Sequence, residues 1–329
     1  MKEFTETSIL KHIGRKLPNP DARVLVGFGD DTAVYKIPNG KFSCITTDAF
    51  VENKHFSLRY FPLYDIGVKS LTSALSDIAA VGGIPSIAVI SLFIRKGIYD
   101  IMIDEIYNGI LKTAKKYWVN IVGGDIVKAD ELAIVFTIVG EIDKSSITLR
   151  SGAKPNDIIC VTGTLGGSFT GRMALEKNLD INTYSLENIV KKHLQPEARL
   201  KESQKLLKTV NVHSMIDISD GLSTDIVHIA EESRVGVHIE ADNIPISEET
   251  KRAISLFNLN PIEVALKSGE EYELLFTIPK EELKILEDNK IGIPITPIGR
   301  VTEKGEKNLL ILPDGTSQVL IPTGYNHFS

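Results

Sequence analysis

The sequence predicts a two-domain protein of the α/β (α+β) class, and three observations lead to this prediction. The chain has 329 residues, which is about two domains at the usual size of roughly 100–200 residues each. Strand-like and helix-like runs alternate along its first half, as in sheets that are covered by helices. Residues 143–157 interrupt this alternation with a cluster of turn-forming residues, after which it starts again. We therefore expect one domain over residues 1–145 and another over residues 146–329.

The predicted elements of the first domain are two helices and several strands. Asp65–Val81 reads as a helix because apolar residues recur at spacings of three and four from Val68 to Ile78. Tyr99–Tyr117 is predicted to be a second, long helix. Apolar or β-branched runs predict strands at Val24–Phe28, Phe42–Thr47, Ile84–Phe93, Val119–Gly123 and Leu132–Ile142.

The second domain restarts with a strand at Ile158–Thr162 and a glycine-rich run at Gly163–Gly171. This run fits neither the Walker A phosphate-binding loop nor a dinucleotide-binding fingerprint. Helices are expected near Phe169–Lys177, Leu186–His193 and Leu222–Glu232. Further strands are expected at Ser214–Ile218, Val237–Glu240, Glu273–Ile278 and Ile295–Val301.

Composition excludes several kinds of partner. The chain is 43% hydrophobic and 24% charged, as expected for globular domains with full cores. A net charge of -6, with no block of five Lys or Arg residues, argues against a nucleic-acid surface. No apolar run approaches the roughly 18 residues that a membrane-spanning helix needs.

The cysteines and the first residues favour a cytoplasmic location. Cys44 and Cys160 lie in apolar strand-like runs, and they form neither a disulfide framework nor a zinc-ligand pattern. Free cysteines are typical of a reducing compartment. The first six residues, Met1–Glu6, are too polar for a signal peptide.

Seven aspartates stand where a predicted strand ends or where a helix presents a polar face, and almost none has a basic residue close in sequence. They are Asp30, Asp31, Asp48, Asp77, Asp125, Asp217 and Asp220. Carboxylates that converge within a few ångströms repel one another, so they need cations between them. Oxygen ligands suit Mg²⁺, and a site with several Mg²⁺ ions usually handles phosphates.

Each motif also has a simpler explanation, which the sequence leaves open. Asp77 lies about 200° around the helix from Leu75, so it is either an exposed helix residue or a ligand beside small residues. Residues 29–32 form either a turn or a ligand loop, and residues 46–48 either a helix N-cap or a metal-binding strand end. Asp217 and Asp220 are each either an N-cap of the next helix or a ligand.

Four further features have the same ambiguity. Gly123 and Gly124 permit positive φ and leave backbone N–H groups uncovered, which suits a phosphate. Arg150 is either a solvated residue or a phosphate ligand, and His55 either packs or binds. The acids of residues 270–273 read as a solvated turn. P-loop, protein-kinase and nucleophile-elbow signatures are absent.

Together and in order, these motifs resemble those of thiamine-monophosphate kinases, over a span from about Phe4 to Phe328. The matching segments are residues 29–31, 46–48, 75–82, 123–125, 150–155, 217–222, 269–277 and 324–328. The family belongs to the superfamily of aminoimidazole ribonucleotide synthetase and selenophosphate synthetase. The resemblance implies that superfamily's two-domain fold, in which the N-terminal domain binds ATP and Mg²⁺ and forms a homodimer, and the C-terminal α/β domain completes the site.

The resemblance implies direct in-line transfer of the ATP γ-phosphate to thiamine monophosphate, which gives thiamine diphosphate. Several Mg²⁺ ions are implied, a K⁺ requirement stays open, and no residue acts as a general base. The implied metal ligands are Asp31, Thr46, Thr47, Asp48, Asp77, Asp125, Asp217 and Asp220. The implied ATP contacts are Tyr107, Gly124, Asp125, Arg150 and Ser219, and the implied substrate contacts are His55, Glu270 and Tyr325.

The chain departs from the family pattern in three places. The family's Gly-Gly-Glu-Asp is Ser268-Gly269-Glu270-Glu271 here, residues 322–323 are Pro-Thr where some members carry an aromatic residue, and Gly-Tyr-Asp is Gly324-Tyr325-Asn326. The alternatives are another ATP-dependent enzyme of the superfamily or a non-catalytic nucleotide-binding module. A non-catalytic module would be expected to have lost some of the acids, whereas all seven are present.

Overall fold

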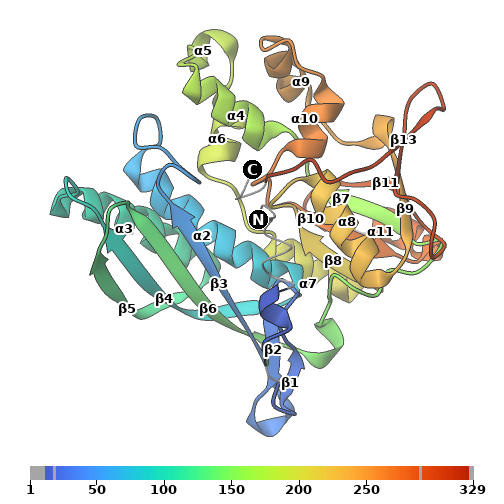
Figure 1. Cartoon of the computed structure of the whole chain (residues 1–329), viewed down its shortest axis with the longest axis horizontal. Helices are drawn as coiled ribbons and strands as arrows, with labels where there is room; N and C mark the ends of the chain where they lie inside the picture. Colours follow the sequence, from blue (N-terminus) through green and yellow to red (C-terminus); the bar gives the residue numbers. More distant parts are fainter. Residues whose placement is uncertain (1–11, 18–19, 289–290, 326–329) are drawn as a thin grey trace. The chain divides into compact units, whose positions relative to one another are not determined.

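The computed structural model describes residues 12–17, 20–288 and 291–325, and Figure 1 shows its path. The described chain forms two compact units. The first contains the described residues up to Ile78, then Gly83–Ile147 and Tyr325, and the second contains Ala79–Gly82 and Thr148–Gly324. Compared with a single boundary after residue 145, Ala79–Gly82 belongs to the second unit and Tyr325 belongs to the first. The matched residues beyond this part of the chain, Phe4–Lys11 and Asn326–Phe328, lie outside the described structure.

The first unit contains a six-stranded sheet in the order β1-β2-β3-β6-β4-β5. Its strands are β1 (Val24–Val26), β2 (Ala33–Lys36), β3 (Phe42–Val51), β4 (Ile84–Ile94), β5 (Asn120–Lys128) and β6 (Ala133–Ile142). Neighbouring strands are antiparallel except for the parallel pair β4–β5. The sequence predicted every strand except the short β2.

Two of these strands continue further than the sequence predicted, which changes where two motifs lie. β3 pairs with β6 as far as Val51, so residues 46–48 lie inside a strand and form no helix N-cap. β5 pairs with β4 as far as Lys128, so residues 123–125 also lie inside a strand. In both cases the ladder of backbone hydrogen bonds outweighs the local tendency of Asp and Gly to end a strand.

The predicted helices of this unit are α2 (Leu63–Ala80) and α3 (Asp100–Tyr117), which cover the sheet (Figure 1). Between residues 65 and 80 every position of α2 is buried except Asp77, which is partly exposed. The two helices cross closely because each has a glycine at the contact. A Cβ on Gly67 would overlap the carbonyl oxygen of Ile106, and a Cβ on Gly109 would overlap that of Tyr64.

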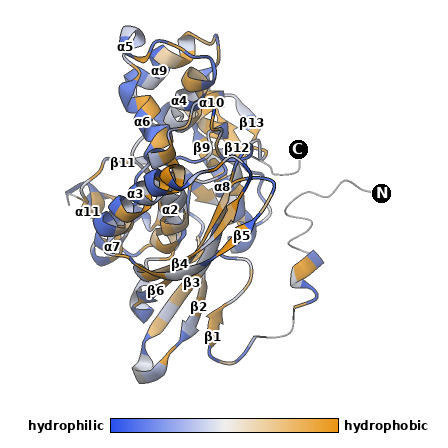
Figure 2. Ribbon diagram, turned by 90° about the vertical axis from the view of Figure 1, so that its left-hand side faces the viewer, coloured by the Kyte–Doolittle hydropathy of each residue, from blue (hydrophilic) through white to orange (hydrophobic). Residues whose placement is uncertain are grey.

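One face of this sheet is buried, and the other is partly exposed and apolar. Ile134, Phe136 and Ile138 of β6 are 0% exposed, whereas the residues between them are half-buried. On the opposite face from these three, Ile87 and Val89 of β4 are 39% and 40% exposed. Figure 2 shows hydrophobic residues along the strands of this sheet.

The second unit contains a seven-stranded sheet in the order β13-β12-β9-β11-β7-β10-β8, with only β9–β12 parallel. Its strands are β7 (Ile158–Thr162), β8 (Ser214–Asp217), β9 (Gly236–Glu240), β10 (Leu274–Ile278), β11 (Ile295–Thr302), β12 (Leu309–Ile311) and β13 (Ser317–Val319). The predicted strands are confirmed, and β12 and β13 were not predicted.

Eight helices accompany this sheet in the described chain. They are α4 (Gly167–Glu176), α5 (Ile181–Tyr184), α6 (Glu187–Leu194), α7 (Leu200–Thr209), α8 (Leu222–Ser233), α9 (Glu248–Ser255), α10 (Pro261–Lys267) and α11 (Leu283–Asp288). The sequence predicted α4, α6 and α8. Short 3₁₀ turns occur at Ala241–Asn243 and Lys280–Glu282 in this unit, and at Pro38–Gly40 and Lys144–Ser146 in the first. The apolar face of α8, with Leu222, Ile226 and Ile229, packs in one core with the central strands.

The register of this sheet brings three chain segments to one of its ends. Leu275 of β10 pairs with Val161 near the end of β7, and Leu274 pairs with Asp217 at the end of β8. The segments after β7, after β8 and before β10 therefore lie together. These are the glycine-rich run, the Asp217–Gly221 motif and the acidic residues 270–273.

Both cysteines are buried free thiols, as the sequence predicted. Burial raises the pKa of Cys44 to about 11 and that of Cys160 to about 12. No helix in the described part of the chain combines the length and the apolar character needed to cross a bilayer.

The α2–α3 crossing predicts that Gly67→Ala destabilises the protein. Alanine favours a helix over glycine by about 1 kcal/mol, but the added methyl group would collide with the Ile106 carbonyl. We expect a net loss of about 1–3 kcal/mol in the free energy of unfolding, measured by urea denaturation. Gly27→Ala is the control, because its Cβ would meet nothing nearer than 3.9 Å. An unchanged or raised stability in Gly67→Ala would contradict the close crossing.

Candidate active site

In the first unit, three predicted metal ligands lie together: Asp31 from the turn before β2, Thr46 from β3 and Asp77 from α2. Carboxylate oxygens of Asp31 and Asp77 lie within 4.8 Å of each other. The Thr46 hydroxyl donates a hydrogen bond to Asp77 Oδ2 at 2.7 Å, so it fixes the orientation of this carboxylate. Asp31 and Thr46 are each 8% exposed. The cluster offers only oxygen ligands, which suits Mg²⁺.

The neighbouring motif residues divide between ligand-like and structural positions. Alternate strand residues share a face, so the side chain of Asp48 points to the same face as that of Thr46. The Thr47 hydroxyl points to the other face and donates to the carbonyl of Phe136 at 3.1 Å. The structure therefore does not bring this hydroxyl to the cluster. Asp30 accepts a hydrogen bond from the backbone N–H of Asp31 at 2.9 Å, which stabilises the turn.

Gly124 and Asp125 lie on the edge strand β5, three positions away from β3 in the sheet. Paired residues run across the sheet in the order Asp48, Phe136, Ile90 and Gly124. At about 4.8 Å per strand, Asp48 and Gly124 are roughly 14 Å apart, and the next residue, Asp125, points to the opposite face of the sheet from Asp48. One Mg²⁺ ion, with ligands at about 2.1 Å, cannot bind both.

Gly124 serves a different purpose from the one that the sequence suggested. Neither Gly123 nor Gly124 has a positive φ. A Cβ on Gly124 would overlap the carbonyl oxygen of Ile90, so glycine is needed here for the close approach of β4.

His55 packs against aromatic residues and has a defined tautomer. Its ring stacks on Phe50 at 5.5 Å between centroids, and Phe50 stacks on Phe56 at 5.1 Å. The backbone N–H of Val51 donates to His55 Nδ1 at 3.0 Å. In the neutral ring the proton is therefore on Nε2, which is the nitrogen that can donate to a ligand. Tyr107, on α3, is half-buried, and this burial raises the pKa of its hydroxyl.

In the second unit, three carboxylates gather between β8 and the start of α8. Burial raises the pKa of Asp225 well above its ordinary value, and the charges of Asp220 and Asp217 raise it further. The Gly221 backbone N–H, which donates to Asp225 at 3.0 Å, and the charge of Arg150 lower it. Arg150 therefore lies close enough to act on this group.

Neither Asp217 nor Asp220 is the helix N-cap that the sequence allowed. Gly221, with a φ of 122°, occupies the N-cap position of α8 and provides no side-chain hydrogen bond. The conformation is one that residues with a Cβ rarely adopt, so glycine is required.

The Asp217–Gly221 motif and the predicted substrate residue Glu270 are direct neighbours. The backbone N–H of Glu270 donates to the carbonyl of Ser219 at 2.7 Å. The C-terminal segment reaches the same helix, because Gly324 N–H donates to the hydroxyl of Thr224 at 3.1 Å. Tyr325, the next residue, is 42% exposed.

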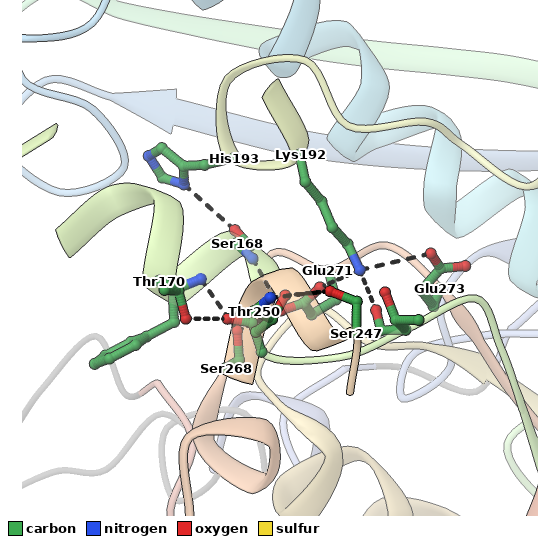
Figure 3. A network of polar contacts seen from close by, with 12 residues as sticks. Ser168, Thr170, Lys192, His193, Ser247, Thr250, Ser268, Glu271 and Glu273 are labelled. Atoms are coloured by element: carbon green, nitrogen blue, oxygen red, sulfur yellow. Dashed lines mark hydrogen bonds and ion pairs between the residues drawn. The ribbon is translucent and has the colours of Figure 1, made fainter. Parts of the chain in front are cut away.

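The acids of residues 270–273 are not the solvated turn that the sequence predicted. Glu271 and Glu273 are 2% and 1% exposed. Lys192 forms ion pairs with Glu271 at 2.7 Å and with Glu273 at 3.8 Å (Figure 3). Arg199 donates two hydrogen bonds to Glu273, each at 2.7 Å.

Sequence reasoning missed Lys192 and Arg199 altogether. Both are far from the acids along the chain, and each resembles an ordinary surface residue of a helix. One signal was available, namely a run of acids that leads directly into the apolar strand 274–278. Acids that enter a buried strand need cationic partners.

Two sequence families match the chain. Residues 29–142 match the AIR synthase related protein, N-terminal domain, and residues 154–311 match the AIR synthase related protein, C-terminal domain. The thiamine-monophosphate kinase of Bacillus subtilis is 37% identical over 308 residues, which cover 92% of this chain and 93% of that protein. The thiamine-monophosphate kinase of Aquifex aeolicus is 34% identical and covers 100% of this chain and 99% of its own.

Solved structures agree with these matches. AaThiL complexed with AMPPCP and TMP is 33% identical, has a TM-score of 0.86 and covers 100% of this chain and 98% of its own. The hydrogenase maturation protein HypE in complex with ATP is 20% identical with a TM-score of 0.71, which shows a shared fold alone. The predicted two-domain fold is therefore confirmed.

The Asp31–Asp77 pair predicts that Mg²⁺ stabilises the protein through Asp77. In Asp77→Asn one of two neighbouring charges is lost while an acceptor for Thr46 remains, so stability without metal should be unchanged or higher. Saturating Mg²⁺, at about 100 times its dissociation constant, should stabilise the native chain by about 2.7 kcal/mol and the variant by less.

Thermal unfolding with and without Mg²⁺ measures this difference. Asp104→Asn, on the exposed side of α3, is the control and should respond to Mg²⁺ like the native chain. An equal Mg²⁺ response in Asp77→Asn would exclude Asp77 as a ligand.

Proposed function

The chain belongs to the thiamine-monophosphate kinases of the AIR synthase-related superfamily, and we propose that it transfers the ATP γ-phosphate directly to thiamine monophosphate. The family is an ATP-dependent kinase family. The near full-length similarity to its members carries the proposal. The geometry of the site supports a transfer that is assisted by metal ions and needs no general base.

The acids of the chain fit the role of Mg²⁺ ligands. We propose that Asp31, Asp48 and Asp77 bind metal in the first unit, with Thr46 holding Asp77 in place. Asp217 and Asp220 provide carboxylates in the second unit, and Asp125 provides one at the sheet edge. Two statements stay predictions from the sequence. The first is that Asp217 and Asp220 share ions with the first unit, and the second is that Thr47 binds metal.

Bound Mg²⁺ would screen the charges of donor and acceptor and stabilise the charge of the transferring group. Asp48 and Asp125 lie three strands apart and point to opposite faces of the sheet, so one ion cannot bind both, which supports more than one ion. We propose that the positive charge of Arg150 and the Ser219 segment contact the nucleotide, and that Tyr107 and Gly124 contribute. These roles rest on the resemblance and on the neighbourhood of Arg150 and the acids.

In the proposed step, an oxygen of the acceptor phosphate forms a bond to the γ-phosphorus while the bond from this phosphorus to the β–γ bridging oxygen breaks, and ADP leaves. The second pKa of a phosphate monoester is about 6, so the attacking oxygen is already ionised at neutral pH. No side chain has to remove a proton. We further propose that His55, through Nε2–H, and the carboxylate of Glu270 contact the substrate, and that Tyr325 approaches its ring.

We also propose that the enzyme is a homodimer that works in the cytoplasm. The face of the first sheet opposite to Phe136 carries Ile87 and Val89, which are 39% and 40% exposed. A partly exposed apolar sheet face of this kind favours a second copy as its cover. The two free cysteines favour a reducing compartment.

The reaction itself is tested with ATP, Mg²⁺ and thiamine monophosphate, with K⁺ or Na⁺ as the monovalent salt. We expect thiamine diphosphate and ADP in a ratio of one to one, no reaction with unphosphorylated thiamine, and no phosphorylated enzyme on rapid quenching. Asp48→Asn should fold normally and lose turnover. ATP hydrolysis without thiamine diphosphate, or a covalent phospho-enzyme, would contradict the mechanism.

The dimer is tested by sedimentation of the native chain and of Val89→Lys. The native chain should have twice the mass of one chain, and the variant the mass of a single chain, because the added charge would be buried between the copies. Ile101→Lys is the control, since Ile101 is 69% exposed on α3 and should leave the dimer intact. A Val89→Lys dimer would show that the copies associate elsewhere.

A further inference from the structure

The segment that carries Glu270 is bound to the start of helix α4 through two side chains (Figure 3). The Ser268 hydroxyl donates to Glu271 Oε1 at 2.5 Å. The same oxygen accepts a hydrogen bond from the backbone N–H of Ser168 at 3.1 Å, and Ser268 accepts one from Phe169 N–H at 3.2 Å. The first N–H groups of a helix have no partner within it. Ser268 and Glu271 therefore cap α4 from a distant part of the chain.

The second oxygen of Glu271 is held by an ion pair rather than by a hydrogen bond. Glu271 Oε2 lies 2.7 Å from Lys192 Nζ, and the same ammonium group donates to the carbonyl of Thr164. The glycine-rich run is thus held at Thr164 by Lys192 and at Ser168 by Glu271. The start of a helix after glycines commonly binds a phosphate. Here the carboxylate of Glu271 occupies that position.

The backbone on both sides of Glu271 is in a conformation that needs support. Glu270 and Tyr272 have φ values of 57° and 52°, in the left-handed region that residues with a Cβ rarely occupy. The backbone N–H groups of Glu271 and Tyr272 both donate to the carbonyl of Ile218, at 3.1 and 2.9 Å. Such conformations persist only where the surrounding contacts fix them, and they often occur at functional sites.

We propose that Glu271, with Ser268 and Lys192, is a positioning residue that fixes the left-handed backbone of Glu270 and thereby places the Glu270 carboxylate against thiamine monophosphate. The inference rests on the proposed function, because it takes Glu270 as a substrate contact. Glu271 would act on the substrate through Glu270 and not by direct contact, since its oxygens face α4, Ser268 and Lys192.

The test is a double-mutant cycle between Glu271→Gln and Glu270→Ala. Glutamine keeps the shape of the side chain but loses the ion pair with Lys192. We expect Glu271→Gln to raise the KM for thiamine monophosphate about 10- to 100-fold, as for a misplaced binding group, with kcat changed much less. In the Glu270→Ala background the same change should have no further effect on KM.

Three further variants complete the test. Glu271→Asp keeps the negative charge, so its KM should rise less than that of Glu271→Gln. Ser268→Ala should also raise KM, and it tests the same contact if Glu271→Gln folds poorly. Ser247→Ala removes another helix cap of this unit, the hydrogen bond from Thr250 N–H at 3.1 Å. It should lower the melting temperature and leave KM unchanged.

An unchanged KM in Glu271→Gln, or an equal rise in both backgrounds, would overturn the proposal. An unchanged KM in Glu270→Ala would instead remove Glu270 from the substrate site, and the positioning role would fail with it. If no thiamine diphosphate forms at all, the proposed function fails. Hydrogen exchange of the Glu270 backbone then tests separately whether Glu271 holds this backbone in place. Glu271→Gln should then speed exchange of the Glu270 N–H, which is bonded to Ser219, and unchanged exchange would refute the role.

Discussion

Glu271 and Glu273 are buried at the end of the β7–β10–β8 strands, and a buried carboxylate without a cation costs several kcal/mol. Lys192 and Arg199 supply the cations from helices that are distant in sequence. These ion pairs fix how the helices α6 and α7 meet the sheet. They also hold the segment that leads from Glu270 into β10 next to Ser219. The arrangement of the second unit around its candidate site therefore depends on the neutralisation of two acids.

The candidate metal ligands differ from these two acids, because their neighbours include other acids. Asp31 has Asp77 as a close neighbour, and the pKa of Asp225 is raised by its burial and by Asp220 and Asp217. Acids that neighbour acids keep their charge only when cations are supplied from outside. The chain thus distinguishes two kinds of buried acid. Glu271 and Glu273 lie against Lys192 and Arg199, whereas the acids proposed as metal ligands are grouped with one another, as expected for residues that would share a bound Mg²⁺.

Much of this architecture was predictable from the sequence because its strong patterns are local. The periodicity of residues 65–81 predicts α2, and the apolar run 158–162 predicts β7. The ends of β3 and β5 were not predictable, because pairing with β6 and β4 carries these strands through residues that usually end one. Short helices such as α9 and α10 have too few turns to show a period. The family resemblance implied that Asp31 and Asp77 belong to one site, but the contact from Thr46 to Asp77 depends on how β3 packs against α2, which the sequence does not show.

The two departures at Ser268 and Glu271 are best understood as one contact. A glutamate is one methylene longer than the aspartate of the family pattern, so its carboxylate reaches further from the backbone. Ser268 supplies a hydroxyl where that pattern has glycine, and this hydroxyl binds the Glu271 carboxylate at 2.5 Å. Each residue alone would leave a buried polar group with fewer partners, which is costly. Together they satisfy each other and the first N–H groups of α4. A change at one position alone should therefore cost more stability than a change at both, which is consistent with the chain departing from the family pattern at the two positions together.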